Sequence, residues 1–211
     1  PTTNVDTMSS AGFSDAFILK LNNNLTFSWA KKIGGNLQDE IHALDLDNQD
    51  NIYLAGLFNG ACDFDPGIAV RQLVANNSDG FIMKLNSSGL FSWINQIGGK
   101  QGDAAVGVAV DLQNNIHVLG TFGDTVDFDF DSSAVVNLIA QGNSDHFIEQ
   151  LDTLGNFAWV KHFTGNVSSA PTSILIDQQN NLYSAGSFLG TVDFDPSAGN
   201  NSRSANAMED V

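Results

Sequence analysis

Short apolar stretches separated by polar turn residues run along the whole chain. They are about four to eight residues long, rich in β-branched and aromatic side chains, and bounded by Asn, Asp and Gly. In the stretch 81–85, Phe81, Met83 and Leu85 share one side of an extended strand, and Ile82 is apolar on the other side. This pattern predicts strands covered on both faces, as in packed sheets. No segment has the spacing of a helix, so we predict an all-β fold.

The pattern repeats about every 65 residues. The tryptophans at 29, 93 and 159 lie 64 and then 66 positions apart, within the similar stretches FSWAKKIGG, FSWINQIGG and FAWVKHFTG. Each unit also contains a stretch like DAFILKL, one like NIYLAGLF, and the tripeptide DFD. We therefore predict one repeat domain over 1–211. Its units are approximately 15–78, 79–144 and 145–211, with 1–14 as the tail of a preceding repeat.

Each unit predicts two hairpins, because short turns at 85–89, 111–115 and 151–155 separate pairs of strands. A four-stranded antiparallel sheet, covered on both faces and repeated in tandem, is the blade of a β-propeller. We predict such blades, with a solenoid stack of the same units as the alternative. Propellers usually close with about four to eight blades, so three units predict part of a larger propeller. The remaining blades would come from a longer chain or from association through open strand edges.

The units resemble the SBBP repeats, or seven-bladed β-propeller repeats, of secreted bacterial proteins. The resemblance covers nearly the whole chain and is carried by D-x-F-I-x-K-L, the Trp before Gly-Gly, V-D-x-x-x-N-I-Y-x-x-G and V-D-F-D-P. It implies that the strand with Asp47, Asp111 or Asp177 is innermost and the tryptophan strand outermost. The chain would then hold half a blade, two complete blades and another half. The resemblance also implies secretion from Bacteroidetes-like bacteria and a scaffold or surface role without a shared enzymatic activity.

Three residues depart from the repeat pattern. In the third unit Thr164 replaces the first Gly of the Gly-Gly pair, and Pro171 enters the innermost strand. In the second unit Phe130 stands where the other units have proline. These changes predict loops that are not strictly equivalent.

The chain is strongly acidic, with 8 basic and 24 acidic residues and a formal net charge of -16. This charge disfavours nucleic acid and anionic lipid as partners, whereas it suits divalent cations and a soluble secreted protein. The single cysteine, Cys62, stands where the other units have Val126 and Val192, which predicts a small buried side chain. No run of 18 apolar residues and no signal-peptide pattern occurs, so we expect no direct membrane insertion.

The DFD tripeptides are the sharpest candidates for a binding site, because alternating aspartates place two carboxylates on one side of an extended backbone. They predict possible calcium binding and no other cofactor. The alternative is that the aspartates cap turns by accepting backbone N–H bonds, while the intervening phenylalanine anchors the loop in the core. The candidate metal ligands are Asp63, Asp65, Asp127, Asp129, Asp131, Asp193 and Asp195.

Other polar residues give weaker signals for chemistry. The aspartates before the DAFILKL-like stretches, Asp15, Asp79 and Asp145, are expected to form turns. The histidines do not recur between units, and no HExxH, GxSxG or CxxC spacing occurs. They are His42, His117, His146 and His162. We therefore expect no catalytic residues and no enzymatic activity.

The recurring residues are all of packing or turn types, which predicts a binding or structural scaffold outside the bacterial cell or on its surface. A protein or glycan partner would bind at the variable loops. A first alternative is a structural subunit that assembles through open blade edges into a larger surface particle or filament. A second alternative is a hydrolase or lyase with its site in the propeller channel, which would need carboxylates or histidines to converge there.

Overall fold

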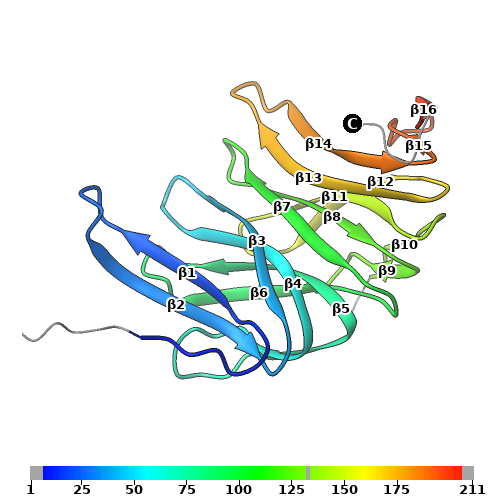
Figure 1. Ribbon diagram of the computed structural model, residues 1–211. Coiled ribbons are helices and arrows are strands. Elements are labelled where there is room, and N and C mark those ends of the chain that lie inside the picture. Colours follow the sequence, from blue (N-terminus) through cyan, green and yellow to red (C-terminus); the bar gives the residue numbers. More distant parts are fainter. Residues whose placement is uncertain (1–6, 132–133, 206–211) are drawn as a thin grey trace, which may run out of the picture.

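The computed structural model describes residues 7–131 and 134–205, which form sixteen strands and no helix. The strands follow the chain from one end of the array to the other (Figure 1). They are β1 (Ala16–Leu21), β2 (Phe27–Gly35), β3 (Asp39–Leu46), β4 (Ile52–Asp63), β5 (Gln72–Leu85), β6 (Phe91–Ile97), β7 (Ala104–Val110), β8 (Ile116–Phe122), β9 (Thr125–Asp127), β10 (Asn137–Ile139), β11 (Asp145–Leu151), β12 (Phe157–Phe163), β13 (Ser168–Ile176), β14 (Leu182–Leu189), β15 (Thr191–Asp193) and β16 (Ser202–Ser204).

Two complete sets of four antiparallel strands form the middle of the molecule. One runs β3-β4-β5-β6 and the other β7-β8-β11-β12. The pairs β1–β2 and β13–β14 lie at opposite ends, in blue and orange in Figure 1. The predicted all-β class and four-stranded antiparallel blades are confirmed. The unit boundaries at 78/79 and 144/145 stay a prediction; β5 runs across the first of them.

The innermost strands β3, β7 and β13 contact one another in that order. Each contains a bulge at the equivalent position, between Ile41 and Ala43, between Ala105 and Gly107, and between Pro171 and Ser173. Proline has no N–H to donate and is tolerated in a sheet at such irregularities. Pro171 therefore leaves the hairpin of the third repeat equivalent to the other two at this point.

The turns after the innermost strands repeat atom for atom. The Oδ1 atom of Asp111 accepts hydrogen bonds from the backbone N–H groups of Gln113 and Asn115, and its Oδ2 accepts one from the Asn115 side chain. Asp47 and Asp177 make the same three bonds. The carboxylate satisfies backbone donors that the turn leaves unpaired, which is why D-x-x-N-N recurs. The turn interpretation of these aspartates is confirmed.

Apolar side chains fill the space between successive sheets. Tyr53, Ala55, Ile82 and Ile97 of the first sheet belong to one core with Phe122, Phe128 and Phe147 of the second. The tryptophans have equivalent surroundings, since Trp29 and Trp93 contact the turn glycines of the following sheet, Gly89 and Gly155. Covered faces, predicted from apolar residues on both sides of the strands, are confirmed. Cys62 is fully buried, as predicted. None of the described segments is a helix able to cross a bilayer.

Candidate functional site: the open edge of β14

Each complete sheet contains a cluster of three phenylalanine rings. In the first sheet Phe58, Phe64 and Phe81 pack edge to face, with centroid distances of 5.1, 4.9 and 6.4 Å. The rings come from the second strand, the DFD tripeptide and the third strand. In the second sheet the equivalent rings have centroid distances of 5.6, 4.7 and 6.2 Å. All six rings are fully buried.

The third cluster lacks one ring. Phe188 and Phe194 pack edge to face at 5.4 Å, and they are equivalent to Phe58 and Phe64. The third ring of the cluster belongs to the strand that pairs with the second strand of a sheet. Among the residues that the structure describes, β14 pairs only with β13, so its other edge carries no strand. Phe194 accordingly remains 38% exposed, whereas its equivalents are fully buried.

A cavity of about 100 Å³ lies where the third ring would stand. In the complete sheets the third ring packs on a glycine of the second strand. A Cβ added at Gly120 would come within 2.5 Å of the Phe147 ring, and one at Gly56 within 2.8 Å of the Phe81 ring. Gly186 occupies the same position in β14 and lines the cavity with His146, Ser169, Pro171, Ser184, Ala185, Ser187, Phe188 and Phe194. Engineered apolar cavities of about 150 Å³ accept benzene, so this cavity suits a side chain on the scale of one ring.

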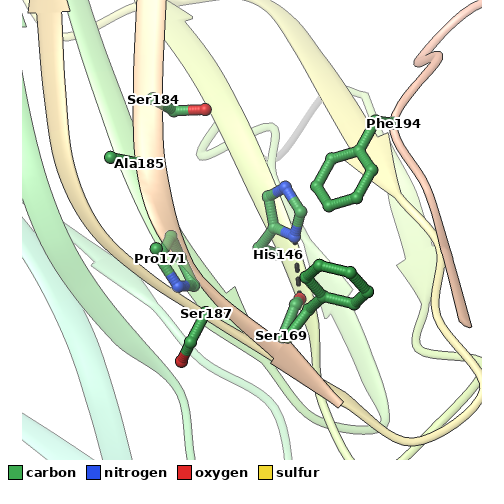
Figure 2. Close-up of a pocket in the computed structure, with 9 residues that line it drawn as sticks. His146, Ser169, Pro171, Ser184, Ala185, Ser187 and Phe194 are labelled. Carbon is green, nitrogen blue, oxygen red and sulfur yellow. Dashed lines mark hydrogen bonds between the residues drawn. The ribbon is translucent and has the colours of Figure 1, made fainter. Parts of the chain in front are cut away.

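His146 and Ser169 close one side of the cavity. The His146 Nδ1 and Ser169 Oγ atoms are 2.7 Å apart, and the histidine ring lies beside Phe194 (Figure 2). The other face of the histidine stacks on Phe163, with centroids 4.4 Å apart and an interplanar angle of 5°. Burial lowers the pKa of His146 to about 4. The imidazole is therefore neutral at pH 7 and behaves as a packing group with one internal hydrogen bond.

A serine beside a histidine is also the start of a catalytic triad, which needs a third group to orient the histidine. The adjacent carboxylate, Asp145, is engaged elsewhere, because it accepts hydrogen bonds from His162 Nε2 at 2.7 Å and from the backbone of Gln141 and Gly165. Burial raises the pKa of Asp145, but these hydrogen bonds outweigh it and leave the pKa below its usual value. The Ser–His pair therefore has no orienting acid among the described residues.

Sequence reasoning missed this site, although a signal was present. Ser169 stands where the other repeats have Asp39 and Asp103, and each aspartate there accepts two backbone hydrogen bonds. His146 stands where the other repeats have alanine and Gly80. Two linked departures in one repeat, at positions that meet in space, mark the third repeat as different.

The candidate metal ligands all lie in hairpins beside the sheets. The first aspartate of each DFD accepts two backbone hydrogen bonds through Oδ1: Asp63 from Asp65 and Arg71, and Asp127 from Asp129 and Val136. Asp193 does the same in the third repeat. Within the ranges 7–131 and 134–205, no three His, Cys, Asp or Glu residues are grouped to hold a metal ion. The geometry is that of turn capping, and calcium binding stays a prediction.

The remaining histidines each contact one carboxylate and do not converge. The His117 Nε2 atom lies 3.2 Å from Asp111, and the His42 Nε2 atom lies 3.1 Å from Glu40. The three strand-start aspartates bond to equivalent residues of the outermost strand, Asp15 to Lys32, Asp79 to Gln96 and Asp145 to His162. These contacts join strands within a sheet.

Comparison with known proteins gives one weak relative. No protein-family model matches the chain. An uncharacterized WD repeat-containing protein of Acanthamoeba polyphaga mimivirus is 24% identical over 180 residues, which cover 78% of this chain and 13% of that protein. WD repeats build propeller blades of four strands, although their usual length of about 40–45 residues is shorter than the unit here. The sheet topology and this similarity together identify a repeat protein with a propeller-like all-β fold.

Proposed function

We propose that this chain is a non-catalytic protein-interaction scaffold that binds a partner strand along β14. The observation that carries the proposal is the incomplete third aromatic cluster beside an unpaired strand edge. A partner strand would gain backbone hydrogen bonds from β14, and its aromatic side chain would enter the cavity. This is strand addition, in which the main chain supplies affinity and a side-chain pocket supplies specificity.

The repeat itself describes the strand that fits. In the complete sheets the ring faces the glycine of the second strand, in the pairs Gly56 with Phe81 and Gly120 with Phe147. The partner should therefore present a phenylalanine opposite Gly186. In the first sheet Lys84 follows three residues later, 3.8 Å from Asp47 and 5.0 Å from the Tyr53 ring centroid. Asp177 and Tyr183 offer the same acidic and aromatic pair beside β14, and both are exposed.

The test is titration with a cyclised hairpin peptide of residues 78–97, which carries Phe81 and fills the equivalent site of the first sheet. We expect micromolar binding by calorimetry, and about 10- to 100-fold weaker binding by the same peptide with Phe81→Ala, since the ring is the buried anchor. Ser184→Arg in the protein should abolish binding, because Ser184 lines the cavity and is exposed. Equal binding of the two peptides, or none, would contradict the proposal.

We further propose that the protein works outside a bacterial cell, secreted or on its surface. The SBBP-like repeat pattern and the net charge of -16 support this location, and the same pattern supports an origin in Bacteroidetes-like bacteria. A glycan at the variable loops and assembly into a larger surface particle also belong to this proposal. Fractionation of the source organism, with an antibody against the chain, should find it in the medium or on the cell surface and not in the cytosol.

Calcium in the DFD hairpins is a separate proposal, supported by the paired carboxylates of Asp127, Asp129 and Asp131. A cation that binds only the folded chain raises its melting temperature in proportion to occupancy. We expect melts in calcium and in chelator to differ by several degrees. Magnesium at the same ionic strength is the control, and identical melts together with no calcium by elemental analysis would remove the proposal.

A further inference from the structure

The strand pair that β14 lacks is present at the other end of the same chain. The β1–β2 pair is equivalent to β5–β6 and to β11–β12, the two outer strands of the complete sheets. The β13–β14 pair is equivalent to β3–β4 and β7–β8, the two inner strands. Among the described residues, β1 has only β2 as a neighbour and β14 only β13. The two ends are thus complementary halves of one four-stranded sheet.

The exposed apolar residues on these halves are the ones that the complete sheets bury. Phe17 is 66% exposed, whereas its equivalents Phe81 and Phe147 are 1% and 0% exposed. Tyr183 is 55% exposed, whereas its equivalent Tyr53 is fully buried. Leu19 and Leu21 are also exposed on β1. Each end therefore exposes apolar surface for which the internal repeats show the covering partner.

We propose that a second copy of this chain docks its β1–β2 pair on β14, head to tail, with Phe17 of one copy completing the Phe188–Phe194 cluster of the other. This inference rests on the proposed function and names the partner strand. The pairings Gly56–Phe81 and Gly120–Phe147 set the register, so Phe17 lies opposite Gly186. The same register places Lys20 opposite Tyr183 and within reach of Asp177, as Lys84 is placed relative to Tyr53 and Asp47.

The number of strands favours a closed pair of copies. The twelve strands β1–β8 and β11–β14 amount to three blades per copy, counting the two halves as one. A head-to-tail contact forms a ring if its rotation closes and an open filament if it does not. Two copies give six blades, within the usual range of about four to eight, whereas three copies would give nine. The proposal is therefore a ring of two copies with two identical junctions.

Sedimentation of the 22.5 kDa chain tests this arrangement. We expect a dimer, and at least about 100-fold weaker association for Phe17→Asp and for Ser184→Arg, each of which disables one side of every junction. An equimolar mixture of the two variants should form dimers again, because one intact junction remains between unlike copies. Phe13→Asp is the matched control, since Phe13 is 89% exposed but lies outside the β1 strand; it should leave the dimer unchanged.

Several results would overturn the proposal. They are a folded chain that stays monomeric at high concentration, dimers that persist in either variant, or variants that fail to rescue each other. Growth into filaments would overturn the closed ring. The hairpin titration separates this inference from the proposed function. Phe17→Asp leaves β14 intact and should still bind the peptide, so peptide binding by a chain that does not self-associate would remove the second copy as partner and keep the strand-binding function.

Discussion

Phe147→Ala is expected to lower the free energy of unfolding by about 3–5 kcal/mol, whereas Phe17→Ala, at the equivalent position of the repeat, is expected to change it by less than about 0.5 kcal/mol. The difference arises because Phe147 is fully buried between Phe122, Phe128 and Gly120, while Phe17 is exposed. Removing the Phe147 ring leaves a cavity in the core; removing the Phe17 ring from a monomer leaves none.

Chemical denaturation of the two variants measures this difference. Both substitutions are made in the Ser184→Arg background, so that association through β14 adds nothing to the stability of either protein. Phe81→Ala is a second buried member of the comparison and should match Phe147→Ala. Similar losses for the position-17 and position-147 variants would contradict the placement of the sheets, because the two rings would then have similar surroundings.

Glu149→Met is expected to stabilise the protein by about 1–3 kcal/mol at pH 7. Glu149 is fully buried in β11, and neither of its carboxylate oxygens has a hydrogen-bond partner among the described residues. The equivalent residues in the other repeats are Leu19 and Met83, which shows that this position accepts an apolar side chain. Denaturation at fixed pH measures the gain, and Met83→Leu is a control for an apolar exchange at an equivalent buried site.

The gain should depend on pH. Burial raises the pKa of Glu149 well above its usual value, and the charge of Asp129 raises it further. The folded state therefore keeps a proton that the unfolded state releases above about pH 4.5, so the folded protein loses stability as the pH rises from that value toward the folded pKa. The advantage of Glu149→Met should be small at pH 4 and grow toward pH 7. An advantage that shrinks with rising pH would show that Glu149 is ionised and stabilised in the fold.

Much of the architecture could be predicted because the repeat shows the same environment several times. The spacing of the tryptophans fixed the unit length, and the apolar residues on both strand faces predicted covered sheets. Turns with D-x-x-N-N were predictable because a carboxylate there bonds to nearby backbone donors. Strand pairing depends mainly on such local and periodic signals, and the structure confirms it at Asp47, Asp111 and Asp177.

The candidate site was less predictable, because it arises from contacts between distant residues. The sequence pointed to the DFD carboxylates, whose oxygens bond to their own hairpins. It did not point to the missing ring, since Phe188 and Phe194 look like their equivalents in sequence and differ only in what covers them. Nor did it pair His146 with Ser169, which lie 23 residues apart and meet only when β11 and β13 pack together.

Hydrogen exchange at β14 tests the central claim most directly, because the equivalent strands β4, β8 and β14 differ chiefly in whether a third strand pairs with them. In the Phe17→Asp monomer, we expect the amides of 182–188 to exchange faster than those of 52–58 and 116–122. Saturation with the hairpin peptide of residues 78–97 should slow them toward the rates of the other two segments. If 182–188 is already as protected as 116–122 in the isolated monomer, or is unchanged by the peptide, the edge of β14 is not an open strand-binding site.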